Sequence, residues 1–284
     1  MLQNYPIDSN HLRVRGVKML KIISVLILTT AMSCSANIYT SISDQNTEQA
    51  LLENAVKAIN NGDYDSAIEY IGRITSSFRR DPKVSKTAAA AYAGKCGLNF
   101  FDMVTTITAV TADTPLMMMM KAFQTVTVTP SSCNTAQLEI ENKYGMTSAA
   151  RPTDINLFLA ILGMAKMGTY LRSLADVNQD AVVDAGFADA CTVGTITDAN
   201  TIEVGTGLGL LLDNITSLTA SVAGNAAITA LAALQLVCGA PCVITDVNSP
   251  SWTAANIKVI RSAIKSNTFG IQGCANAPFV TCCP

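Results

Sequence analysis

The sequence of 284 residues contains little charge: Lys, Arg, Asp and Glu make up 14% of it, against about a quarter of an average soluble protein. Its 19 basic and 21 acidic side chains leave a formal charge of −2. The basic excess that binds a phosphate backbone is therefore missing, and we expect no nucleic-acid partner. A composition of 49% hydrophobic residues also excludes a disordered tail protein. Uncharged polar side chains must therefore cover most of the surface.

An export signal is indicated near the N-terminus. From Met19 the chain has one lysine, an apolar run at residues 22–28 and then small residues. This is the layout of a secretory signal, and its apolar centre is too short to span a bilayer. Residues 1–18 are then either an over-long start or an extended n-region. An ordinary secretion signal that is cleaved without lipidation is the alternative interpretation.

The end of this segment, Ala31-Met32-Ser33-Cys34, resembles the lipobox of bacterial lipoproteins. The resemblance implies that residues 1–33 are a signal peptide, that Cys34 is lipidated, and that residues 34–48 form a lipidated tether. In enterobacteria an aspartate after the lipidated cysteine retains a lipoprotein at the inner membrane, and here Ser35 stands there. The resemblance thus implies an anchor in the outer membrane of a Gram-negative bacterium, facing the periplasm or the cell surface.

Histidine is absent from the chain that remains, because the single histidine, His11, is removed with the signal. Its absence excludes Ser-His-Asp and Cys-His catalysis, histidine metal sites and histidine pH switches. The glycines in residues 205–209 make no phosphate loop, since no strand precedes them and no Lys-Ser/Thr pair follows. We therefore expect no catalytic residue, a protein that is not an enzyme, and no cofactor apart from the calcium considered below.

Eight cysteines follow Cys34, and an even number in an exported chain favours up to four disulfides. The spacing leaves their connectivity open. The segment Cys238-Gly-Ala-Pro-Cys242 has the alternative interpretation of a redox or zinc motif, although its spacing is one residue too long. We expect the adjacent Cys282 and Cys283 to pair with different partners, which would tie the C-terminus beside Cys274 and the 238–242 turn. The disulfide candidates are Cys96, Cys133, Cys191, Cys238, Cys242, Cys274, Cys282 and Cys283.

Two helices separated by a tight turn are predicted first. Apolar residues three or four apart place one helix at residues 46–58, and a second runs from Ala67 to Phe78. With the Gly62-Asp63 turn between them, these residues resemble one tetratricopeptide unit. A helical hairpin without repeat ancestry is the alternative, since an isolated repeat cannot bury its own face.

The rest of the sequence predicts an all-α fold: an irregular helical bundle with disulfide-stapled loops, in one domain over residues 49–284 or two sub-bundles at 49–150 and 151–284. Residues 124–153 are expected to be a loop with at most one short helical turn, and apart from 123–128 no alternating run suggests a strand. Four consecutive methionines, 117–120, are interpreted either as part of an apolar ligand site or as core filler. Further helices are predicted at residues 84–104, 117–123, 154–175, 202–222, 225–237 and from the Ser249-Pro250 cap to about Gly270.

An acidic segment directly after the 154–175 helix has the spacing of a calcium loop. Oxygen ligands at alternate positions suit Ca²⁺, although Ala181 replaces the usual glycine and Phe187 stands where a bidentate glutamate is expected. The alternatives are therefore a weak calcium site and a helix-capping acidic turn. The candidate ligands are Asp176, Asn178, Asp180, the carbonyl of Val182, and Asp184.

The lipobox, the hairpin and the helical remainder together resemble the lipoproteins that accompany TRAP-type transporters, the T-component family. That resemblance implies a non-enzymatic, lipid-anchored envelope protein that presents a helical surface or pocket to a protein partner or a small apolar ligand. The alternative is a structural envelope lipoprotein, stabilised by its disulfides and a weak calcium loop, that binds no ligand.

Overall fold

The computed structural model describes residues 46–100, 102–103, 105, 113–221, 234–235, 237–276 and 278–284. The signal peptide, Cys34, residues 34–45 of the tether and nearly all of the predicted 225–237 helix lie outside these residues. What is described is helical, which confirms the all-α prediction, and the only β-pairing within it is an isolated bridge between Ser266 and Cys274. The α-helices are α2 (Glu48–Asn60), α3 (Tyr64–Arg73), α4 (Pro82–Cys96), α6 (Pro115–Lys121), α7 (Ser131–Tyr144), α8 (Thr153–Ala175), α9 (Asp198–Asp213), α10 (Ile215–Ser221) and α12 (Ala254–Lys265), and the 3-10 turns are η1 (Phe78–Arg80), η2 (Ser148–Ala150), η3 (Ala240–Val243) and η4 (Phe279–Thr281).

The predicted hairpin is present as α2 and α3. Gly62 takes a positive φ of 75° at the turn, a conformation that glycine adopts without a steric penalty. Asp63 then caps α3, because its carboxylate accepts the backbone N–H of Ser66 at 3.1 Å. Fully buried Ala67 allows α3 to pack closely against α2 and α4.

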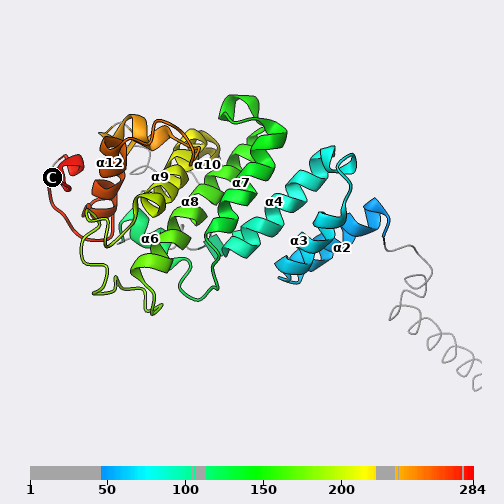
Figure 1. Cartoon of the computed structure of the whole chain (residues 1–284), viewed down its shortest axis with the longest axis horizontal. Coiled ribbons are helices and arrows are strands. Elements are labelled where there is room, and N and C mark those ends of the chain that lie inside the picture. The colour runs from blue at the N-terminus through cyan, green and yellow to red at the C-terminus, as the bar shows by residue number, and fades with distance from the viewer. Residues whose placement is uncertain are drawn as a thin grey trace, which may run out of the picture. The chain divides into compact units, whose positions relative to one another are not determined.

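The helices α3, α4, α7, α8, α9 and α12 pack side by side in a row that keeps their order along the chain. Figure 1 shows α4, α7, α8, α9 and α12 in this row. The most extensive contact joins α8 and α9. Gly163 and Gly207 face each other there: a Cβ atom on Gly163 would lie 2.6 Å from the Gly207 carbonyl oxygen and 2.8 Å from the Leu211 nitrogen. Two glycines thus let the backbones of these helices approach closely.

Helix α8 is the central helix of the core. It is the one described helix that is long and apolar enough to cross a membrane, and 72% of its most apolar 18-residue window is buried inside the protein. α6 and α10 pack against it in addition to its neighbours in the row. Burial on several sides explains its nearly continuous apolar sequence.

Several helix boundaries differ from the sequence prediction. The second helix of the hairpin, expected from Ala67 to Phe78, runs from Tyr64 to Arg73, and Phe78 lies in the 3-10 turn η1. The helix expected at 84–104 ends at Cys96, where Gly97 takes a φ of 113° and closes it. The helix expected at 202–222 begins earlier, at Asp198, and is interrupted at Asn214. The last helix begins at Ala254, where the cap is Thr253 and not the predicted Ser249-Pro250 pair, and it ends at Lys265.

The prediction of a loop over residues 124–153 is wrong, because α7 occupies much of this segment. α7 buries Cys133, Ala136 and Ile140 at helical spacing, but the same face also buries Gln137 and Glu141. Polar residues on the inward face remove the apolar periodicity from which a helix is predicted.

Candidate functional site

Hydrogen bonds from backbone N–H groups to the carboxylates of the acidic loop after α8 hold this loop in its conformation. Asp176, which is fully buried, accepts the backbone N–H of Asp180 through Oδ1 at 2.9 Å and that of Ala181 through Oδ2 at 3.2 Å. Asp180 in turn accepts the N–H of Val182 at 2.9 Å. At the other end, Asp184 accepts the N–H of Val177 at 2.7 Å.

Two residues of the same loop, Gln179 and Ala181, adopt the left-handed backbone conformation, with φ of 63° and 66°. Phe187, at the position of the bidentate glutamate, is buried in the core and supplies no oxygen. In the part of the chain that the structure covers, no three His, Cys, Asp or Glu side chains are close enough to hold a metal ion. The hydrogen bonds favour the acidic-turn interpretation, and calcium binding stays a prediction.

The eight candidate cysteines lie in four pairs at disulfide distance: Cys96 with Cys133, Cys191 with Cys283, Cys238 with Cys242, and Cys274 with Cys282. The adjacent residues Cys282 and Cys283 do pair with different partners, as predicted. The expected link from the C-terminus to the 238–242 turn is wrong, because Cys238 and Cys242 pair with each other and Cys191 takes the second C-terminal cysteine.

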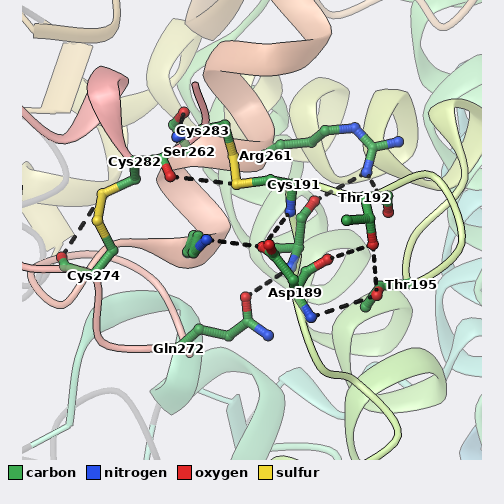
Figure 2. A network of polar contacts seen from close by, with 12 residues as sticks. Asp189, Cys191, Thr192, Thr195, Arg261, Ser262, Gln272, Cys274, Cys282 and Cys283 are labelled. Atoms are coloured by element: carbon green, nitrogen blue, oxygen red, sulfur yellow. Dashed lines mark hydrogen bonds and ion pairs between the residues drawn. A yellow bond between two sulfur atoms is a disulfide. The ribbon is translucent and has the colours of Figure 1, made fainter.

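A polar network surrounds the two C-terminal pairs and fastens them to α12 (Figure 2). Ser262 of α12 accepts the backbone N–H of Cys283 at 3.1 Å. Arg261, which is almost fully buried, donates to the carbonyl oxygens of Ala190 and Thr192 and to the Asp198 carboxylate. The loop between α8 and α9 and the C-terminal segment are therefore both held on the same helix.

A buried ionic cluster lies where α7, α8 and α9 meet. The ammonium of Lys166, a fully buried side chain, lies 3.0 Å from the Glu203 carboxylate and donates to Thr206 Oγ1 at 2.5 Å. Asn134 donates to the other oxygen of Glu203 at 2.6 Å, while its own Oδ1 has no hydrogen-bond partner. Burial lowers the pKa of Lys166, and the Glu203 carboxylate opposes this shift. Burial, with a smaller effect of Glu203, raises the pKa of Tyr170.

An arginine cluster lies beside the ionic cluster. The buried guanidinium of Arg151 donates to Asn156 at 3.0 Å, to Asp213 at 2.8 Å and to Asn214 at 3.1 Å. It also lies 3.9 Å from the carboxylate of Glu141. Burial raises the pKa of Glu141, against the effect of Gln137 and Arg151. The arginine thus joins the end of α9 to the start of α8.

Neither cluster is predicted from the sequence, although the sequence carries a weak signal. Lys166 interrupts the apolar 154–175 segment, and a lysine inside such a run is rarely left without a buried partner. Most polar atoms of the two clusters have partners inside the protein, with Asn134 Oδ1 as an exception, and the geometry of both clusters indicates cross-links between helices. Thr206 Oγ1 lies beside the Lys166 amine, but both residues are fully buried.

The methionine segment does not line an open groove. Met118, Met119 and Met120 are all buried, and so are the α8 residues opposite them. These side chains fill the core, which agrees with the interpretation of the methionines as core filler.

A hollow in the described surface lies at the turn between α2 and α3, where α4 ends. It has two lobes, of about 470 Å³ and about 310 Å³, which share the lining residues Gly97, Asn99, Asp102 and Val126. The wall opposite α4 is the segment 121–129, in which Thr125 and Thr127 are exposed. The charged residues in the lining are Asp63, Asp65, Asp102, Lys95 and Lys121.

Both lysines of this hollow already have partners: Lys95 contacts Asp65 at 2.5 Å, and Lys121 contacts Asp113 at 2.9 Å. The remaining charge in the lining is therefore negative. No family model, characterised protein or solved structure matches this chain, so the interpretation of the hollow depends on this geometry.

Proposed function

We propose that the protein is a non-enzymatic, lipid-anchored envelope protein whose helical body presents a surface to a protein partner, with the hollow at the α2–α3 turn as the docking site. The observation that carries this proposal is the hollow itself, which has an excess of acidic side chains after its lysines are paired. A partner segment with a positive charge would complement it. The lining mixes apolar side chains with charged ones such as Asp63 and Asp102, and the charged side chains favour a charged partner segment over a wholly apolar ligand.

Photocrosslinking in native envelopes tests this proposal. A photoreactive amino acid replaces Thr127, which is exposed in the wall of the hollow, and in a matched control it replaces Val193, which is 60% exposed and lies outside the lining. We expect one dominant crosslinked protein from position 127 and none from position 193. Equal crosslinking to many proteins from both positions would contradict a docking site.

Charge-reversal variants show whether the negative charge of the hollow attracts the partner or the partner is crosslinked only because it is nearby. Asp102→Lys reverses a charge shared by both lobes, while Glu69→Lys makes the same change on α3 outside the lining. We expect the crosslink from position 127 to fall at least fivefold in the first variant and to stay within twofold in the second. If the yield of the crosslink changes in neither variant, the partner is not held by the negative charge of the hollow.

The second candidate function is a structural envelope protein without a ligand. The pairing of all eight cysteines and the absence of an opening at the methionine segment favour it. In that case no partner is captured from position 127, and removal of disulfides alone alters the protein's behaviour in the envelope. The crosslinking experiment therefore distinguishes the two candidates.

A further inference from the structure

The buried ionic cluster brings a lysine amine, an asparagine amide and a carboxylate together from three helices. Lys166 lies on α8, Asn134 on α7 and Glu203 on α9. The lysine Nζ lies 3.0 Å from Oε2 of Glu203, and the amide nitrogen of Asn134 donates to Oε1 of the same carboxylate at 2.6 Å. A nucleophile, an acyl group and a group that can move a proton between them are therefore neighbours in the core.

Lys166 meets the conditions under which a lysine acts as a nucleophile. Its side chain is fully buried, and burial lowers the pKa of the amine, which raises the fraction that is neutral. Desolvation is one of the ways in which proteins activate a lysine to attack a carbonyl carbon. Thr206 Oγ1 accepts a hydrogen bond from Nζ at 2.5 Å and fixes the position of the amine.

The amide of Asn134 is held at one end only. Its nitrogen is bonded to Glu203, whereas its Oδ1 is buried and has no hydrogen-bond partner. A buried carbonyl without a partner is unfavourable, so the unreacted amide is not stabilised at its oxygen. Because only the nitrogen is held, rotation about the side-chain bonds of Asn134 can move its carbonyl carbon toward the lysine amine.

We propose that this cluster is a modification site at which Lys166 and Asn134 join in an intramolecular isopeptide bond, with loss of ammonia and with Glu203 as the catalytic residue. Both reactants belong to the folded chain, so burial does not prevent the reaction and no substrate has to enter. Groups that are held side by side react as if at a very high concentration. The bond is independent of the docking function proposed for the hollow.

The reaction is a substitution at the amide carbon, without oxidation or reduction. The electron pair of the neutral lysine amine forms a bond to Cγ of Asn134, and Oε2 of Glu203 takes the proton that the attacking nitrogen loses. Glu203 then gives a proton through Oε1 to Nδ2 of Asn134. The Cγ–Nδ2 bond breaks, its electron pair leaves with the nitrogen as ammonia, and the carboxylate is restored.

The charges around Lys166 set the rate of this reaction. Glu203 on α9, Glu141 on α7 and Asp246 after η3 all favour the ammonium and so oppose the effect of burial on the lysine pKa; Tyr170 also lies beside Glu203. We therefore expect a slow reaction that accelerates as pH rises. Freshly folded protein keeps the ion pair of Lys166 and Glu203, and the bond accumulates as the protein ages.

The bond extends a covalent connection that the structure already contains. Asn134 directly follows Cys133, which is at disulfide distance from Cys96 at the end of α4. With the isopeptide bond, α4, α7 and α8 become linked to one another by side chains as well as by the main chain. A reductant removes the first of these links and leaves the second intact.

Mass spectrometry of the full chain tests this proposal. Purified protein is incubated for two weeks at pH 6 or pH 9, then reduced and digested with trypsin, which does not cleave after an acylated lysine. We expect an intact mass lower by one ammonia and a branched peptide that joins residues 122–143 to residues 144–172. The yield at pH 9 should be at least tenfold higher, because more of the lysine is neutral. No branched peptide at either pH, or ammonia loss confined to other asparagines, would overturn the proposal.

Two matched variants test the part played by Glu203. Glu203→Gln keeps the size of the side chain but cannot take up the proton, and we expect the branched peptide to fall at least tenfold. Glu139→Gln makes the same change on α7 outside the cluster and should leave the yield within twofold of the wild type. An undiminished yield in Glu203→Gln, or a branched peptide at the same masses in Asn134→Ala, would contradict the assignment. Circular dichroism verifies that each variant keeps its helical content.

Discussion

Replacement of Lys166 by methionine should destabilise the protein strongly. The lysine side chain is fully buried, and its partner Glu203 is 18% exposed. Removing one member of a buried ion pair typically costs about 3–5 kcal/mol, because the other charge remains buried without compensation. Partial exposure of Glu203 and its hydrogen bond from Asn134 place the expected loss near the lower limit, at about 3 kcal/mol.

The double variant Lys166→Met/Glu203→Met should recover most of this loss. Well-packed apolar residues often replace a buried ion pair without a penalty, so we expect its free energy of unfolding within about 1 kcal/mol of the wild type. Lys86→Met provides the control, because Lys86 pairs with Asp154 on the surface, where 47% and 65% of the two side chains are exposed. That change should cost less than about 1 kcal/mol.

Urea unfolding, monitored by circular dichroism with all disulfides intact, measures these differences in the free energy of unfolding. The double-mutant cycle gives the coupling between Lys166 and Glu203, which we expect to exceed about 2 kcal/mol, because Glu203→Met also leaves the buried Lys166 without its partner. If Lys166→Met costs no more than Lys86→Met, or if the double variant is as unstable as the sum of the single variants, the ionic cluster does not cross-link α8 and α9 as described.

Three further predictions concern other parts of the fold. Gly163→Ala should destabilise the protein by about 1–3 kcal/mol, because the new Cβ meets the backbone of α9; Gly186→Ala, with no atom within 4 Å, should leave the melting temperature unchanged, and an equal effect of both would contradict the close contact. If the acidic loop only ends a helix, Asp180→Ala lowers the melting temperature equally with and without millimolar calcium; a rise with calcium in the wild type alone would instead establish the ion site. The raised pKa of Glu141 means that the folded state binds more protons than the unfolded state, so its contribution to stability is full below the ordinary pKa of 4.5 and is lost as pH rises through the folded-state pKa. Glu141→Gln should therefore show a flatter decline of stability above about pH 4.5 in urea titrations, and an unchanged pH profile would contradict the assignment.

Much of the fold follows from local sequence signals. The hairpin is predictable because Gly62 and Asp63 encode a turn and a helix cap within a few residues. Helix α8 is predictable because its apolar run is long and is interrupted only by isolated polar residues. These signals need no knowledge of what the segments pack against.

The parts that were not predictable depend on contacts between distant residues. The inward face of α7 is polar because Gln137 and Glu141 meet Thr245 and Arg151 there, and neither partner is recognisable from the helix itself. The pairing of Cys191 with Cys283 likewise depends on the packing of the C-terminal segment on α12. The acidic loop is recognisable from the spacing of its carboxylates. That these carboxylates accept hydrogen bonds from backbone N–H groups is visible only in the three-dimensional structure.

The central claim, an exported and lipid-anchored body whose other cysteines are all paired, is tested most directly by mass spectrometry of the protein extracted from membranes without reduction. The account predicts an N-terminus at Cys34 that carries a diacylglycerol group, together with eight cysteines that resist alkylation until a reductant is added. An N-terminus that retains residues before Cys34, or cysteines that are alkylated without reduction, would contradict it.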